Sequence, residues 1–263
     1  MLGLRSYLLL TVALAAGPAN AAIVTYSNTM AGADFSGTYT GIRSLWQGEL
    51  SSLATVTFDD VPTGFFNNTT LVYDTSNSTF SNQPFLTALT QSQIQIFRFA
   101  SGSRSRAVWG GSNPIPSSSN RYFEGFAGPS NTDYVQVTLP TPATASITAI
   151  ALDLWTQSSS GQNVNVAVYD AANTLIQTYI VPTNPNSTAA FFGITSDAAL
   201  GYLRISSTGG GPMLAQVDFG VLSSGDPGPG PSADTPESAT LGYVGIGVLA
   251  IYLGTNRKAR QQS

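Results

Sequence analysis

Alternating hydrophobic and polar residues predict short β-strands throughout residues 22–222. The clearest case is 162–169 (QNVNVAVY), where valines at every second position face one side and polar or small residues face the other. A turn at Asp170–Asn173 then leads into 174–181, which predicts a hairpin ended by Pro182. Further strands are expected at 22–26, 53–58, 94–99, 121–126, 134–139, 147–155, 200–206 and 213–221.

The segment 147–155 (ITAIALDLW) differs from the others because neither of its faces is strongly polar. One face carries Ile150, Leu152 and Leu154, and the other carries two alanines and Asp153. This pattern is typical of a central strand that is covered on both sides.

Ten or more short strands within about 200 residues favour an all-β domain. No long stretch has apolar residues at the helical spacing of three and four, so the pattern predicts no long helix there. We expect a two-sheet antiparallel β-sandwich of jelly-roll-like topology, with a closed barrel as the alternative.

Residues 1–21 have the features of a secretory signal-peptide helix. Arg5 is followed by the apolar run 7–16, and Ala19 and Ala21 form an A-x-A site for signal peptidase. The run is too short to span about 30 Å of hydrocarbon, which argues against the alternative of a first transmembrane helix.

The C-terminal part divides into three pieces. Residues 223–234 (SSGDPGPGPSAD) have the composition of a Gly/Pro/Ser linker. The uncharged apolar run 239–254 predicts a short hydrophobic helix that inserts transiently into a membrane, and the basic residues after it would stay on the cytoplasmic side. The body of the chain would then lie outside the inner membrane.

Pro236 and Glu237 stand just before this apolar run, and a basic end follows it. The tail therefore resembles the PEP-CTERM sorting signal of Gram-negative bacteria, in which a short Pro-Glu-Pro-like motif precedes a hydrophobic helix and a basic end. Ser238 stands where that family usually has a second proline. The resemblance covers residues 235–263 and implies processing by an exosortase, a membrane cysteine peptidase. It implies a location at the cell surface or outside the cell; a permanent C-terminal anchor is the alternative.

Residues 134–221 also resemble the β-sandwich ectodomain often found upstream of such tails. The resemblance rests on Phe191–Ser196 (FFGITS) and on a last strand that contains Asp218, and Thr57–Asp60 is a fainter echo of it. It implies a shape similar to carbohydrate-binding jelly rolls, although fold alone does not fix an activity.

Composition limits the available chemistry. The chain has no cysteine and no histidine, which excludes disulfides, thiol nucleophiles, histidine bases and the usual zinc sites. Acidic residues outnumber basic ones by 14 to 10, and the arginines of 22–222 are scattered apart from Arg104 and Arg106. Nucleic acid is therefore not an expected partner, because neutralising its phosphates takes clustered lysine and arginine side chains.

The aspartates suggest one candidate metal site. Asp59 and Asp60 end an expected strand, and Asp218 near the last strand could join them. Calcium takes about six to eight oxygen ligands, so these three residues are calcium candidates; no other cofactor is expected. The alternative is a pair of turn-capping aspartates that face water.

A glycosidase needs two carboxylates about 5–10 Å apart across a cleft. Acidic residues are available, but no spacing singles out a pair: Glu49, Asp59, Asp60, Glu124 and Asp153. We therefore expect a non-catalytic protein, and a polysaccharide-acting hydrolase is the least favoured class.

Sugar rings stack on aromatic faces, which makes Trp109, Tyr122 and Trp155 the candidate glycan contacts, with Trp46 and Tyr134 as further aromatic candidates. Trp109 lies in a segment with the composition of a loop. The alternative is that the tryptophans fill the core, which is favoured for Trp46 and Trp155. We expect an exported cell-surface or matrix protein with a structural or adhesive role in the exopolysaccharide or biofilm layer; a carbohydrate-binding module with a specific glycan site is the alternative.

Overall fold

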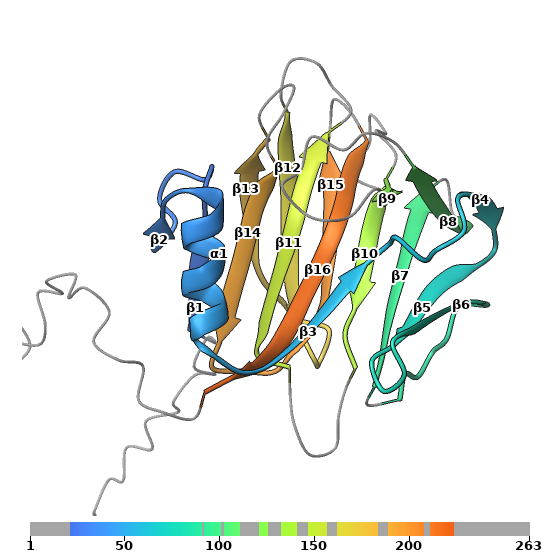
Figure 1. The fold of residues 1–263 in the computed structure, drawn as a ribbon, viewed down its shortest axis with the longest axis horizontal. Coiled ribbons are helices and arrows are strands. Elements are labelled where there is room, and N and C mark those ends of the chain that lie inside the picture. The colour runs from blue at the N-terminus through green and yellow to red at the C-terminus, as the bar shows by residue number, and fades with distance from the viewer. Residues whose placement is uncertain are drawn as a thin grey trace, which may run out of the picture. The chain divides into compact units, whose positions relative to one another are not determined.

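The computed structural model describes residues 22–90, 92–100, 103–110, 121–125, 133–140, 147–156, 162–183, 189–207 and 211–223 (Figure 1). These residues contain one helix, α1 (Tyr39–Gly48), and sixteen strands. The strands are β1 (Ile23–Ser27), β2 (Phe35–Ser36), β3 (Leu50–Thr57), β4 (Gly64–Asn67), β5 (Thr70–Asp74), β6 (Thr79–Gln83), β7 (Gln93–Ala100), β8 (Ser103–Gly110), β9 (Arg121–Glu124), β10 (Tyr134–Thr138), β11 (Ala149–Thr156), β12 (Asn163–Asp170), β13 (Leu175–Pro182), β14 (Ala190–Ser196), β15 (Leu200–Ser207) and β16 (Pro212–Leu222).

The strands belong to one hydrogen-bonded sheet. Its main path runs β13-β12-β15-β10-β7-β8-β9-β16-β11-β14-β1-β2, and β3, β4, β5 and β6 pair alongside it. The pairs are antiparallel except for the short contact between β1 and β2. The all-β prediction is confirmed, whereas two separate sheets are not observed in the described part of the chain.

One hydrophobic core lies between the two halves of this sheet. In Figure 1, β12, β13 and β15 lie behind β11, β14 and β16. Leu152 and Val217 from the front strands belong to the same buried cluster as Val166 and Leu203 from the strands behind. The alternating valines of β12 enter this core, as their spacing predicts.

Helix α1 covers the other face of the front strands, where the sequence pattern predicted no long helix. Thr38 caps its N-terminus, because the Thr38 side chain accepts a hydrogen bond from the Gly41 amide. The helix buries Ile42 and Trp46, one turn apart, and Trp46 Nε1 donates to the Ile194 carbonyl at 3.1 Å.

Small residues on the strands leave room for this helix. Ala149 and Ala151 of β11 belong to the cluster that packs against Trp46, and Gly193 of β14 lies directly below the indole. Every residue of β11 is buried, which confirms the prediction of a strand covered on both sides.

The described residues all belong to one compact unit of the chain, Met1–Ser224. The predicted segments at both ends fall outside the described residues: the signal peptide 1–21 with Ala19 and Ala21, nearly all of the linker, Pro236 and Glu237, and the run 239–254. Among the residues that are described, no helix has the length and apolarity needed to cross a membrane.

Candidate functional site

Polar and aromatic side chains share the outer face of β7, β10 and β15, away from the core. Along β10, Val135 and Val137 are buried in the core cluster, so the alternating Tyr134, Gln136 and Thr138 point outward. The same alternation places four more residues on this face: Phe97 and Phe99 of β7, and Tyr202 and Arg204 of β15.

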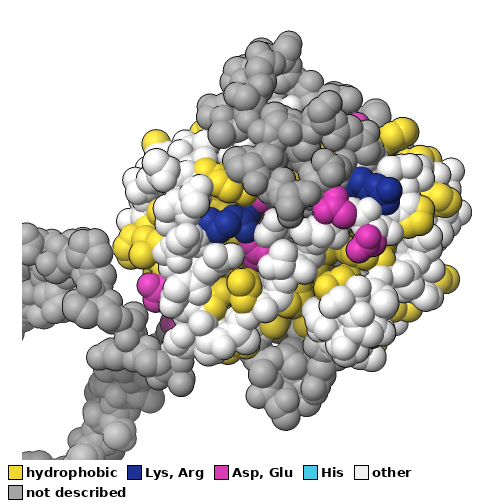
Figure 2. Space-filling model, in the orientation of Figure 1, with side chains coloured by type: hydrophobic (Ala, Val, Ile, Leu, Met, Phe, Trp, Pro, Cys, Tyr) yellow, Lys and Arg dark blue, Asp and Glu magenta, His cyan; other side chains and the backbone are white. Residues whose placement is uncertain are grey.

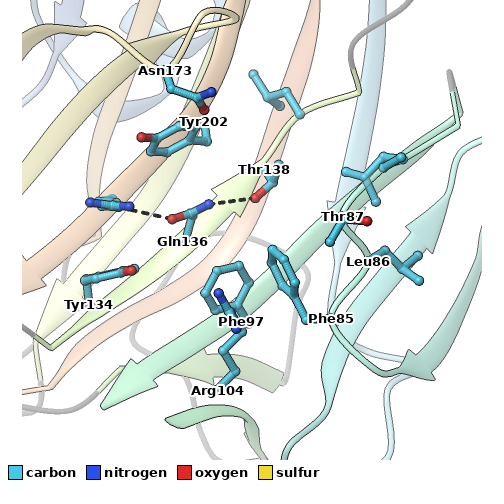
Figure 3. A pocket seen from close by; sticks show the side chains of 14 residues that line it. Phe85, Leu86, Thr87, Phe97, Arg104, Tyr134, Gln136, Thr138, Asn173 and Tyr202 are labelled. Atoms are coloured by element: carbon cyan, nitrogen blue, oxygen red, sulfur yellow. Dashed lines mark hydrogen bonds between the residues drawn. The ribbon is translucent and has the colours of Figure 1, made fainter. Parts of the chain in front are cut away.

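Strand register aligns Arg204, Gln136 and Phe97 across three neighbouring strands. Arg204 Nε donates a hydrogen bond to Gln136 Oε1 at 3.1 Å, and Gln136 Nε2 donates to Thr138 Oγ1 at 3.0 Å (Figure 3). The Gln136 amide therefore holds the guanidinium group, and Thr138 in turn holds the amide.

Three tyrosine rings surround the Arg204 guanidinium. Its central carbon lies 4.6 Å from the ring centre of Tyr134 and 5.2 Å from those of Tyr169 and Tyr202. Tyr169 and Tyr202 are themselves stacked, with ring centres 4.3 Å apart. Burial raises the pKa of the Tyr202 phenol, although the nearby Arg204 charge opposes this. Cation–π contacts of this kind keep the cation in place without neutralising its charge.

A loop forms the wall on the other side of this arrangement. The side chain of Gln95, which is fully buried in β7, accepts from the Leu86 amide at 2.8 Å and donates to the Leu86 carbonyl at 3.3 Å. Phe85, the residue before Leu86 in this loop, packs edge-to-face against Phe97, with the two ring centres 5.4 Å apart. The central carbon of the Arg104 guanidinium lies 3.9 Å from the ring centre of Phe85. Gln95 thus fixes the loop on the sheet.

The space between these groups is a hollow of about 290 Å³, here called the Arg204 pocket (Figure 3). Its lining residues are Phe85, Leu86, Thr87, Ala88, Leu89, Phe97, Arg104, Tyr134, Gln136, Thr138, Leu139, Asn173, Tyr202 and Arg204. The volume is near the lower end of ligand sites, about 300–1,000 Å³, and suits a sugar unit better than a large cofactor. Sequence reasoning identified Tyr134 among these residues but not Arg204 or Gln136.

The three predicted glycan contacts come together at a different place. Trp109 lies opposite Tyr122 in the β8–β9 register, and Tyr122 meets Trp155 edge-on at 5.1 Å. Trp109 is 42% exposed, whereas Trp155 is 8% exposed and packs with Met213. Trp109 is part of a strand, so the prediction of a loop is wrong there. The prediction that Trp46 and Trp155 are core residues is confirmed.

The three calcium candidates are not clustered. Asp59 and Asp60 lie in the turn after β3, whereas Asp218 lies within β16 and is completely buried. Asp218 accepts hydrogen bonds from Arg43 and from Gln216. Across the described residues, no three acidic side chains gather as a metal site would require.

Arg43 of α1 reaches two buried carboxylates on the sheet. Its Nη1 bonds to Asp218, and its Nη2 bonds to Asp153 of β11. Both aspartates have zero exposure, and Tyr39 also donates to Asp153 at 2.7 Å. Burial raises the pKa of Asp153 to about 6, although the Arg43 charge opposes this. These carboxylates join α1 to the sheet and are closed to a substrate.

The face that carries α1 bears few charges. Figure 2 shows mostly uncharged polar and hydrophobic side chains there, with separate basic and acidic groups. The described residues of this face show no cluster of lysine and arginine side chains of the kind that binds nucleic-acid phosphates.

No family model and no curated protein matches the chain. Among solved structures it is similar to the Arthrobacter globiformis T6 isomalto-dextranase complexed with panose, at 16% identity and a TM-score of 0.30, over 64% of this chain and 32% of that one. It is also similar to the enzymatically active domain of bacteriophage CBA120 tailspike protein 4, at 13% identity and a TM-score of 0.29, over 49% and 19% of the two chains. Neither similarity is close enough to assign a family or an activity.

Proposed function

We propose that this protein is exported and binds carbohydrate through the Arg204 pocket, as a non-catalytic structural or adhesive component of an exopolysaccharide layer. The observation that carries the proposal is the group of three tyrosine rings around one guanidinium, with an amide and a threonine hydroxyl beside it. The hydroxyls of a sugar bond to amide and guanidinium groups, and aromatic side chains beside them offer apolar surface to its C–H groups.

Preorganisation supports the same proposal. Gln136 is bonded to Arg204 and Thr138, and Gln95 anchors the loop wall, so these side chains are already ordered before a ligand arrives. Ordering a side chain on binding costs about 0.5–1.5 kcal/mol, which a preformed face avoids. A jelly-roll-like sandwich is the finer fold assignment that accompanies this proposal, supported by the shared core of the two sheet halves.

The test is polysaccharide binding by the purified protein, measured by affinity electrophoresis on the exopolysaccharide of the producing cell and a panel of plant and bacterial polymers. We expect Tyr134→Ala to weaken binding up to about tenfold, because it removes a cation–π contact, worth roughly 0.5–2 kcal/mol, that positions the Arg204 guanidinium. Trp109→Ala is the matched control, since it removes an exposed aromatic outside the Arg204 pocket.

Loss of binding in Trp109→Ala but not in Tyr134→Ala would move the site to the Trp109–Tyr122 pair. Absence of binding to every polymer would contradict the proposed function. The export part of the proposal rests on the sequence at the two chain ends, and mass spectrometry of the mature protein tests it. We expect the chain to begin at Ala22, and a mature peptide that extends through Ile251 would count against exosortase processing.

A further inference from the structure

The charged side chains that line the Arg204 pocket are two arginines, Arg104 and Arg204, and no acidic side chain lines it. Neither arginine forms an ion pair with any described carboxylate. This is unusual for a chain of net charge −4, in which Arg43 pairs with two aspartates at once. The pocket is therefore a local site of positive charge.

Neutral groups hold both guanidiniums. Arg204 lies among tyrosine rings with its Nε bonded to Gln136, and Arg104 lies against Phe85 and Phe97. A carboxylate partner would cancel the charge, whereas rings and an amide position it and leave it able to attract an anion. Within the described part of the chain, no residue accepts a hydrogen bond from the Nη groups of Arg204.

Asp170, at the end of β12, is an acidic residue whose charge acts on Tyr202 of the pocket lining. Its Oδ1 accepts hydrogen bonds from the backbone amides of Ala172 at 2.9 Å and Thr174 at 2.7 Å, so it serves the turn before β13. It does not line the pocket.

We propose that the Arg204 pocket selects acidic polysaccharide, with the carboxylate of a uronic acid unit bound by the Arg204 guanidinium. This proposal rests on the proposed carbohydrate-binding function and names the class of sugar. A planar guanidinium matches a carboxylate with two parallel hydrogen bonds, and Arg104 at the opposite wall can meet a second acidic unit of the same chain.

The test compares uronate polymers (polygalacturonate, alginate and hyaluronan) with the same polymers after chemical reduction of their carboxyl groups to alcohols. We expect binding to at least one native polymer and about 10- to 100-fold weaker binding to its reduced form, as the loss of a charge-assisted pair implies. Arg204→Gln and Arg104→Gln should each lower affinity for the native polymer. Arg121→Gln removes the same charge from β9, outside the pocket lining, and is the control.

The outcomes distinguish the selection of acidic sugar from the proposed carbohydrate binding itself. Equal binding of native and reduced polymers, or an unchanged affinity in both Arg204→Gln and Arg104→Gln, would overturn the selection of acidic sugar while carbohydrate binding stands. Binding to no polymer of either kind would overturn both. If Arg204→Gln melts at a lower temperature, Arg104→Gln decides, because Arg104 is solvent-exposed.

Discussion

Replacing Arg43 by methionine removes the cation that joins α1 to two buried carboxylates. Methionine preserves much of the apolar length of the side chain, so the main change is the loss of charge. Asp153 and Asp218 would remain at zero exposure, with Tyr39 and Gln216 as their remaining side-chain donors. Removing one partner from a buried ion pair costs about 3–5 kcal/mol, because it leaves an uncompensated charge.

The two remaining donors place this variant toward the lower end, near 3 kcal/mol of unfolding free energy. In a domain of roughly 200 residues, each kcal/mol shifts Tm by about 2–4 °C, so we expect a fall of about 6–12 °C at neutral pH.

The loss should depend on pH, with a definite sign. The folded-state pKa of Asp153, about 6, lies above its ordinary value of 3.8, so ionisation of Asp153 lowers stability as the pH rises from about 4 to 6. Arg43 offsets part of this cost in the wild type. Without Arg43 the pKa of Asp153 rises further, so the difference between wild type and variant is largest above pH 7 and shrinks toward pH 4.5.

Urea denaturation at pH 4.5 and pH 7.5 measures both effects. The matched control is the triple variant Arg43→Met, Asp153→Asn, Asp218→Asn, which removes all three charges at once. We expect it to recover most of the lost stability, because neutral groups replace the unpaired buried ions. A loss below about 1 kcal/mol at pH 7.5, or an equal loss at both pH values, would refute the reasoning.

The remaining predictions concern two positions at which the local structure restricts the side chain, Gly193 and Asn173. Gly193→Ala should lower stability by about 1–3 kcal/mol, because the new methyl would lie 2.9 Å from Trp46 Cδ1 and push α1 from the sheet. Gly37→Ala, with open space around it, should have little effect in the same thermal melt. Asn173 has φ of 65°, so Asn173→Val should cost about 1–2 kcal/mol while Asn173→Gly should not; equal melting temperatures for the two Asn173 variants would contradict this.

The strands of the second half could be predicted because their side chains alternate locally. The valines of β12 and the turn before β13 need no distant information, and both lie where the sequence places them. Helix α1 could not be predicted in this way. It is short and contains Gly41, and much of the surface that buries Ile42 and Trp46 comes from β11 and β14, more than a hundred residues later. The Thr38 cap followed by two apolar residues one turn apart was the available signal.

The Arg204 pocket shows the same limit for the candidate site. The segments that contain Gln136 and Arg204 were predicted to be strands, but their contact depends on a register between residues 68 positions apart. Tyr169 comes from a further strand, β12, and Phe85 comes from the loop that forms one wall of the pocket. Alternation along one strand tells which side chains share a face, but not which strand lies beside it.

Arg43 and Arg204 illustrate how the groups around an arginine decide whether its charge stabilises the fold or binds a ligand. Arg43 is bound to Asp153 and Asp218, so its charge is neutralised within the fold, and its removal should affect stability without direct effect on binding. Arg204 is held by tyrosine rings and Gln136, which position its charge and leave it available to a ligand. Its removal should therefore affect binding far more than stability, and a reversal of these two phenotypes would show that the roles of the two arginines are exchanged.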